Sequence, residues 1–225
     1  MIGLVVVSHS AQLASGVAEL AGQMAPSVTI VPSGGDGSGG LGTDYLAVGE
    51  AIARADSGSG VVVLFDLGSA RMVADMAAEE AEGSVVVVDA PLVEGAVAAA
   101  VRAQGGAGLA AVASAASAAA AVFSGAVSEG TGVAAVGDAV RTEVELTNSV
   151  GLHARPAAMV VRALDSLAAS VVVRFGEEEA DAKSVLALMG LGAPGGARIE
   201  VVATGADAAE AVRRVEELAS RRFGE

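Results

Sequence analysis

The chain holds two histidines, and each stands in a setting that favours chemistry at a ring nitrogen. His153 follows a segment, 142–146, whose polar and apolar residues alternate as in a half-buried strand, and apolar residues recur at helical spacing after Pro156. Proline is well tolerated in the first turn of a helix, because the amide that it lacks has no partner there. The pattern therefore predicts a strand-to-helix turn at His153, with the helix starting just after His153 and Arg155.

Such a turn forms a site for an anion. Unpaired amides and the positive end of the helix lie beside the imidazole, and Arg155 adds one guanidinium. The anion that we expect is a phosphoryl group, on His153 or next to it. The alternative is that His153 is only a polar residue near a helix N-terminus.

His9 directly follows the apolar run 2–7, which is typical of a strand buried on both faces of a parallel sheet. Ligands of open α/β sheets bind beyond the carboxyl ends of the strands. A later run, 60–65, brings Asp66 and Ser69 to the same edge. We therefore expect Asp66 to orient the His9 ring, while Ser69 and nearby amides hold a phosphoryl group. The alternative is a plain helix cap, built from the serines that flank His9.

Apolar runs alternate with helical patterns from the first residues to about residue 104. This alternation predicts an α/β fold, a doubly wound and mostly parallel sheet with right-handed crossovers. The expected strands are 2–7, 28–31, 60–65 and 85–88, and the expected helices are 12–24, 45–55, 69–81 and 92–104.

From about residue 141 the pattern changes to strand, helix, strand, strand, helix, strand, helix. It predicts a smaller α+β open-faced sandwich, with helices on one face of an antiparallel sheet. Later strands are expected at 170–175, 178–182 and 198–204, and later helices at 184–189 and at 207–221, the last one capped by Asp207.

Residues 105–137 are a low-complexity stretch of Ala, Ser, Gly and Val. Its first section, 109–122, predicts a last helix of the first domain, and the glycines that follow predict a flexible linker. Such a tether raises the effective concentration of one histidine near the other. The expected domains are 1–124 and 141–225, with the linker at 125–140.

A glycine-rich run at 33–42 invites comparison with nucleotide-binding loops. A P-loop needs a following Lys-Ser or Lys-Thr, and a dinucleotide fingerprint needs its glycines after the first strand, so we reject both. The run predicts either a flexible loop that can close near His9 or a plain surface loop.

Composition limits the chemistry further. Hydrophobic residues make up 53% of the chain and aromatic residues only 2%, so the cores must be built from Ala, Val and Leu. The absence of cysteine excludes disulfides and a thiol nucleophile. A zinc site would have to rely on carboxylates, which is uncommon. We therefore expect no permanently bound cofactor and no metal.

The formal charge of −14 argues against binding to nucleic acid, whose backbone would repel the chain. Most of the 13 basic residues follow residue 140, which suits docking of the second domain onto acidic protein surfaces. The apolar segments 1–7 and 109–122 are shorter than the roughly 20 residues that a membrane span needs. We expect a cytoplasmic protein.

The string Gly-Leu-His-Ala-Arg-Pro-Ala at 151–157 resembles the active-site signature of HPr, the histidine phosphocarrier of the bacterial phosphotransferase system. Lys183-Ser184 and the segments 188–192 and 203–211 also match this family. The resemblance implies an open-faced sandwich, a phosphohistidine at His153 and Enzyme I as its phosphoryl donor. Ser184 matches a regulatory serine of some HPr proteins, but the interpretation that we favour for it is a helix cap.

The first domain resembles the mannose-type EIIA family, in the version that occurs in the phosphotransferase subunit of the phosphoenolpyruvate-dependent dihydroxyacetone kinase. The matching segments are 6–10, 33–35, 41–43, 64–70 and 90–96. That subunit also has its EIIA-like domain before its HPr-like domain. Some members carry a further Enzyme I-like domain, and this sequence ends before one.

These resemblances imply a relay through covalent phosphohistidines. Enzyme I would phosphorylate His153, which passes the group to His9 and then to ADP on the nucleotide-binding subunit of the kinase, whose substrate-binding subunit holds dihydroxyacetone. They also imply a homodimer through the EIIA-like domain. Two alternatives remain: an EIIA-HPr component of a mannose-type sugar transporter, and a regulatory protein controlled by histidine phosphorylation.

Overall fold

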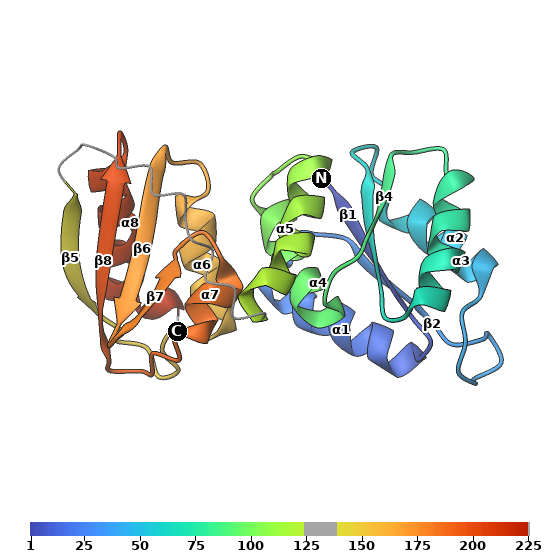
Figure 1. The fold of residues 1–225 in the computed structure, drawn as a ribbon, viewed down its shortest axis with the longest axis horizontal. Coiled ribbons are helices and arrows are strands. Elements are labelled where there is room, and N and C mark those ends of the chain that lie inside the picture. The colour runs from blue at the N-terminus through green and yellow to red at the C-terminus, as the bar shows by residue number, and fades with distance from the viewer. Residues whose placement is uncertain (124–138, 225) are drawn as a thin grey trace. The chain divides into compact units, whose positions relative to one another are not determined.

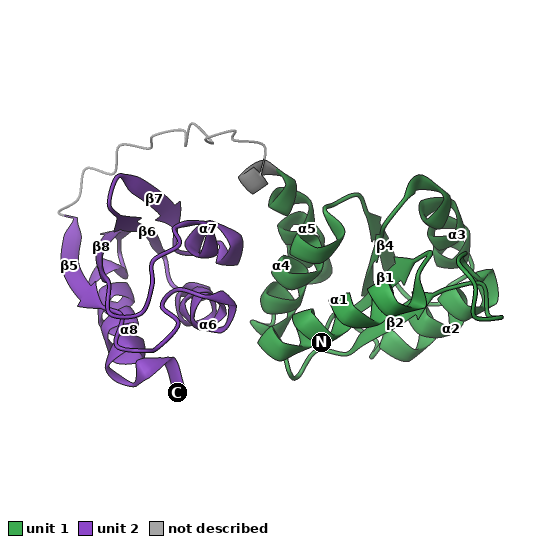
Figure 2. Cartoon of the chain, turned by 90° about the horizontal axis from the view of Figure 1, so that it is seen from below, with its two compact units in different colours: residues 1–125 green, residues 126–225 purple. Residues whose placement is uncertain are grey.

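The computed structural model describes residues 1–123 and 139–224. The chain divides into two compact units, Met1–Gly125 and Ala126–Glu225, which Figure 2 colours separately. Residues 125–138 of the predicted linker (125–140) lie outside the described residues. Its last residue, Val140, is the first residue of a strand.

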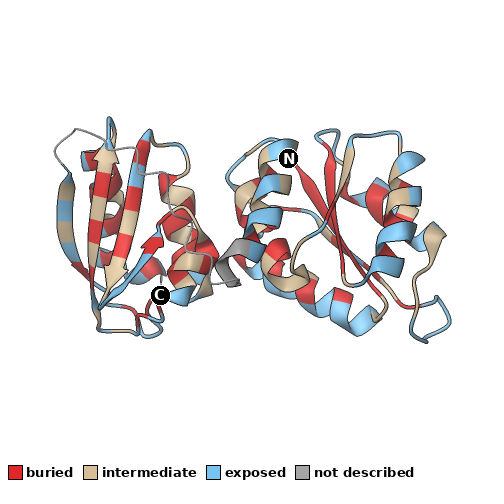
Figure 3. Ribbon diagram, in the orientation of Figure 1, coloured by how far each residue is buried: buried red, intermediate tan, exposed pale blue. Residues whose placement is uncertain are grey.

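The first unit is built around a parallel sheet with the strand order β2-β1-β3-β4 (Figure 1). Its strands are β1 (Gly3–Ser8), β2 (Ile30–Gly34), β3 (Val61–Phe65) and β4 (Val85–Val88). The two central strands, β1 and β3, are buried along their whole length (Figure 3). Their continuous apolar sequences require this burial, which a sheet covered on both faces provides.

Helices cover both faces of this sheet, as Figure 1 shows. One face carries α2 (Tyr45–Ala55) and α3 (Gly68–Glu79), and the other carries α1 (Ala11–Met24), α4 (Leu92–Gln104) and α5 (Leu109–Phe123). Valines of the strands meet alanines of the helices in the core, and this packing of small side chains follows from the low aromatic content. The prediction of an α/β doubly wound, parallel sheet is confirmed.

The second strand lies two residues later than its sequence pattern predicted. Val28 is not part of it, because its amide donates to the Ala25 carbonyl in the turn after α1. Pairing with β1 instead carries the strand forward to Gly34, through Pro32. Proline is tolerated because β2 is an edge strand of this sheet.

The second unit is an antiparallel sheet with the strand order β5-β8-β6-β7, and its helices pack on one face. Its strands are β5 (Val140–Glu145), β6 (Ala169–Phe175), β7 (Glu178–Asp181) and β8 (Arg198–Gly205). Its helices are α6 (Ala154–Leu164), α7 (Val185–Gly190) and α8 (Ala208–Ser220), followed by a 3-10 turn, η1 (Arg222–Gly224). Buried and more exposed residues alternate along β8, as one covered and one open face require. The prediction of an α+β open-faced sandwich is confirmed.

One predicted helix cap is wrong. Asp207 does precede α8, but its side chain makes no cap hydrogen bond. Its carboxylate instead accepts a bond of 2.8 Å from the Ala168 amide, just before β6. A tertiary partner has therefore replaced the local one.

Within residues 1–123 and 139–224, the helices fall short of the combined length and apolarity that crossing a bilayer demands.

Candidate functional site

The side chains of the first site meet at the carboxyl edge of the parallel sheet. Val7 and Phe65 are register partners in β1 and β3, so the residues that follow each strand emerge side by side. The Asp66 amide donates to the Val7 carbonyl at 3.2 Å, which extends this pairing by one step. His9 and Asp66 are therefore brought together by backbone pairing between strands that are far apart in sequence.

The Asp66 carboxylate holds His9 through both the ring and the backbone. Its Oδ1 lies 2.9 Å from the ring Nδ1, and its Oδ2 accepts the His9 amide at 2.8 Å. Burial raises the pKa of Asp66, but hydrogen bonds from the His9 amide and ring, the Ser8 hydroxyl and the Leu67 amide outweigh burial, so the pKa lies below its ordinary value. Asp66 is thus an anion that accepts from the Nδ1 proton.

The other ring nitrogen faces Ser69. Nε2 of His9 lies 2.8 Å from the Ser69 hydroxyl oxygen. Because Asp66 selects the tautomer with its proton on Nδ1, Nε2 carries a lone pair and the hydroxyl donates to it. Ser69 stands in the first turn of α3, where backbone amides have no partner within the helix. The structure thus joins the three residues that the sequence assigned to this edge.

Ser8 is a site residue that sequence analysis did not assign. Its side chain is fully buried, donates to Asp66 Oδ2 at 2.8 Å and accepts from the Ser10 amide at 3.0 Å. A serine that ends an apolar strand needs a partner when buried, and that was the available signal. Ser10 itself caps α1 by accepting from the Leu13 amide, so the capping alternative describes Ser10 and not His9.

The glycine-rich loop contacts the backbone at His9. The Gly42 amide donates to the His9 carbonyl at 2.9 Å, and the Gly35 amide donates to the Ser8 carbonyl at 3.3 Å. A side chain at Gly34 would lie 2.7 Å from the Ser10 carbonyl oxygen, so only glycine permits this approach. The loop is therefore part of the surroundings of His9 and not a plain surface loop.

His153 directly precedes α6, makes no side-chain cap hydrogen bond and is exposed to solvent. The helix begins at Ala154, earlier than predicted, so that Arg155 and Pro156 both lie in its first turn. Proline is tolerated as the third residue because the hydrogen bonds of this helix begin only with the Ala157 amide, which donates to the His153 carbonyl at 2.9 Å. Unpaired amides therefore adjoin the His153 backbone, and the ring is open to a partner protein.

Positive charge gathers on the same helix. Arg155 is exposed, and burial together with the charge of Arg155 lowers the pKa of Arg162. Burial is the larger cause of this lowering, and repulsion between the two guanidinium groups is the smaller one. An incoming phosphoryl group would relieve that repulsion.

The turn before His153 is fixed by a buried asparagine. Asn148 is 2% exposed, and its side-chain amide donates to the Gly151 carbonyl at 2.8 Å. Gly151 has a φ of +70°, and a side chain there would lie 2.1 Å from the Ala193 carbonyl oxygen. The Leu152 amide also donates to Ala193, at 3.0 Å. Asn148 belongs to the motif around His153, but its place in the sequence did not predict this role.

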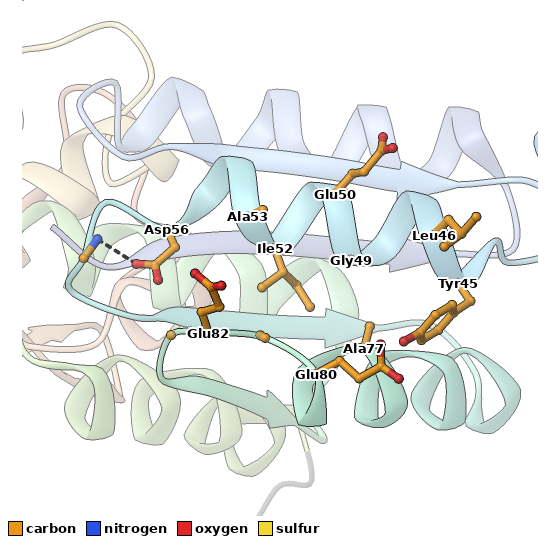
Figure 4. Close-up of a pocket in the computed structure, with 13 residues that line it drawn as sticks. Tyr45, Leu46, Gly49, Glu50, Ile52, Ala53, Asp56, Ala77, Glu80 and Glu82 are labelled. Carbon is orange, nitrogen blue, oxygen red and sulfur yellow. Dashed lines mark hydrogen bonds between the residues drawn. The ribbon is translucent and has the colours of Figure 1, made fainter.

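Two further features are not parts of these sites. Ser184 accepts from the Ala187 amide at 3.2 Å and caps α7, which is the simpler of its two interpretations. A cavity of about 570 Å³ lies between α2 and α3 (Figure 4). Its lining includes the carboxylates Glu50, Asp56, Glu80 and Glu82. Such a lining repels a phosphoryl group.

Comparison with known proteins assigns each unit to the bacterial phosphotransferase system. Residues 3–113 match the family described as "PTS system fructose IIA component", and residues 140–221 match "PTS HPr component phosphorylation site". Each unit therefore carries a phosphotransferase-system domain. The chain belongs to the family of phosphoryl donor subunits of PEP-dependent dihydroxyacetone kinases, known as DhaM.

Three relatives illustrate this membership. The whole chain is 33% identical to the phosphoryl donor subunit DhaM of Providencia stuartii (strain MRSN 2154), of which it spans 51%, about half of that protein. Over 45% of its length it is 37% identical to a DhaM of Listeria innocua serovar 6a, covering 82% of that protein. Over 38% of its length it is 41% identical to phosphocarrier protein NPr of Escherichia coli (strain K12), covering 97% of that protein.

Proposed function

We propose that this chain is a phosphohistidine carrier that serves a dihydroxyacetone kinase. His153 takes a phosphoryl group from Enzyme I, which draws it from phosphoenolpyruvate, and passes it to His9. His9 then delivers it to ADP bound to the nucleotide-binding subunit of the kinase. The observation that carries this proposal is the His9 ring, which is held at Nδ1 by Asp66 and has Nε2 directed at Ser69.

In the second transfer, Nε2 of His9 attacks the phosphorus atom in line with the bond to His153. The ring becomes positive as the N–P bond forms, and the Asp66 carboxylate stabilises that charge. The Ser69 hydroxyl rotates away from Nε2 and donates to a phosphoryl oxygen. The amides of the first turn of α3 supply further donors for the developing charge.

In the first transfer, His153 is the acceptor. The amides at the start of α6 and the Arg155 guanidinium stabilise the charge on the incoming group. Because His153 is exposed, it can reach both the donor and His9. The second unit carries most of the basic residues, which favours its encounter with acidic partners such as the first unit.

The assembly that follows from this proposal includes Enzyme I, the nucleotide-binding and substrate-binding subunits of the kinase, and a homodimer of this chain through the first unit. We place it in the cytoplasm, where these partners act. The intermediates are covalent phosphohistidines, and the scheme needs no permanently bound cofactor. The family name of the relatives, phosphoryl donor subunit, supports the choice of acceptor.

The acceptor is tested by mixing the ³²P-phosphorylated chain, freed of Enzyme I, with both kinase subunits, ADP and dihydroxyacetone. We expect labelled dihydroxyacetone phosphate, formed only when the nucleotide-binding subunit carries ADP. Transfer to the EIIB domain of a mannose-type transporter in its place would support the sugar-transport alternative. Label that stays on the chain with every acceptor would support a regulatory role and contradict the proposal.

A further inference from the structure

In the unphosphorylated first unit, Ser69, His9 and Asp66 form a chain of hydrogen bonds. The Ser69 hydroxyl oxygen lies 2.8 Å from Nε2 of His9, and Nδ1 lies 2.9 Å from Asp66 Oδ1. A hydroxyl in contact with a base that is itself oriented by a carboxylate is the arrangement that activates a serine nucleophile. The distances lie within the range that such catalysis requires.

The surroundings of Ser69 complete the requirements for acyl transfer. Ser69 is exposed, so a substrate can reach its hydroxyl. It lies in the first turn of α3, whose unpaired amides and positive helix end can stabilise an oxyanion. Leu67 and Met72 are 61% and 67% exposed, and Met72 lies one helical turn from Ser69. They provide apolar contacts for an acyl chain.

We infer that the unphosphorylated first unit is a serine acyl-transfer site, with Ser69 as the nucleophile, His9 as the base and Asp66 as the group that orients it. The substrate class is activated esters of short, uncharged acyl groups. Anionic acyl groups are disfavoured because Asp66 is charged and its unit is rich in carboxylates.

The reaction proceeds in two balanced halves. Oγ of Ser69 attacks the ester carbonyl carbon, its proton passes to Nε2 of His9, and the carbonyl electron pair moves onto oxygen. When that pair returns, the bond to the alkoxy group breaks and the alcohol leaves with the proton from Nε2. Water then repeats the sequence on the acyl-serine, so that ester and water become acid and alcohol.

This activity does not depend on the relay. A phosphoryl group on Nε2 would occupy the lone pair that accepts the serine proton, so the two uses of His9 exclude each other. A chain that never meets Enzyme I would still transfer acyl groups. Conversely, a phosphoryl relay would remain possible if Ser69 only oriented the ring.

The purified full-length chain is tested with p-nitrophenyl acetate and, separately, with a fluorophosphonate whose site of attachment is mapped by mass spectrometry. We expect a fluorophosphonate adduct on Ser69. We also expect Ser69→Ala to reduce the protein-dependent hydrolysis about 100-fold, the range of general-base catalysis. Ser15→Ala, which removes an exposed hydroxyl from α1, is the matched control and keeps the wild-type rate.

Imidazole alone attacks p-nitrophenyl acetate, so the rate of the Ser69→Ala variant is decisive. Hydrolysis at the wild-type rate in Ser69→Ala would mean that a histidine, His9 or the exposed His153, reacts directly, and it would overturn the inference. Absence of an adduct on Ser69 in the wild-type protein would overturn it as well. Both outcomes leave the phosphoryl relay untouched, because neither concerns transfer from His153.

Discussion

The carboxylate of Asp66 decides which nitrogen of His9 is available for reaction. It accepts from Nδ1, and it also accepts from the His9 amide and from the buried Ser8 hydroxyl. Since the backbone and the ring are held by the same group, the ring has little freedom to turn. In the proposed relay, Nε2 is therefore the nitrogen that receives the phosphoryl group.

Replacing Asp66 by asparagine tests this role. The asparagine amide keeps the size of the carboxylate but loses its charge. Its NH₂ group would also face N–H and O–H groups that donated hydrogen bonds to the carboxylate. We expect Asp66→Asn to slow single-turnover transfer from His153 to His9 by about 10–100-fold, the usual effect of losing such an orienting partner. Loading of His153 by Enzyme I stays unchanged. Asp89→Asn, in an exposed residue just after β4, makes the same charge change at the same sheet edge and is the control.

The same substitution has a consequence for acid stability. The pKa of Asp66 is lower in the folded protein than in the unfolded chain, so its hydrogen bonds stabilise the first unit above about pH 4. That stabilisation is lost as the pH falls through the folded-state pKa. The protection of β1 amides against hydrogen exchange, relative to the intrinsic exchange rate at each pH, should therefore fall at acid pH in the wild type, and less so in Asp66→Asn. If the protection of β1 amides fell equally with pH in the two proteins, Asp66 would not be the group that stabilises this unit.

At the level of helices and strands, sequence patterns located most elements because strong local signals bound them. Helix α2 has its predicted limits, and Asp44 caps it by accepting from two amides. The side-by-side placement of His9 and Asp66 also followed from the sequence, since both come directly after apolar runs of one parallel sheet. Strand β2 was displaced because its limits depend on pairing with β1, which no local pattern records.

Partners that are distant in sequence also explain why the contacts of two residues were not predicted. Ser8 and Asp207 each take a partner that is distant in sequence, Asp66 and Ala168 respectively. From the local sequence alone, both residues were interpreted as ordinary helix caps. The early start of α6 was missed for another reason, since proline at the first position and proline at the third leave nearly the same sequence pattern.

The turn before His153 offers a prediction at this scale. Alanine at Gly151 would combine a positive φ with a methyl group 2.1 Å from a backbone oxygen. We expect Gly151→Ala to destabilise the second unit by more than the roughly 1–3 kcal/mol that a strained residue costs. It should also slow the loading of His153. Hydrogen exchange of β8 amides in the full-length chain measures the stability of this unit.

Gly176→Ala provides the comparison. Gly176 also has a positive φ, +63°, but a methyl group there would meet no atom within 4 Å. Gly176→Ala therefore measures the cost of a positive φ without a steric clash. It should lower the stability of the second unit less than Gly151→Ala does. Equal losses would show that the contact with Ala193 does not constrain the turn.

At the scale of the whole molecule, the chain joins an acidic first unit to a second unit that holds most of the basic residues. Each unit presents one histidine: His153 at the start of a helix, and His9 at the edge of a parallel sheet. Both parts are net negative, since even residues 141–225 hold 10 basic and 13 acidic side chains, so any attraction comes from local basic side chains of the second unit. In the proposed relay, the histidines need only brief contact for an in-line transfer. In this relay the phosphoryl group moves from His153 to His9.

Rapid-quench labelling with Enzyme I and ³²P-phosphoenolpyruvate tests this order most directly. In the wild type, label should appear first on His153 and then on His9. His9→Ala should keep the label on His153, and His153→Ala should carry no label on either residue, because Enzyme I then has no acceptor on the chain. Label on His9 in His153→Ala, in the absence of any added HPr, would contradict the relay.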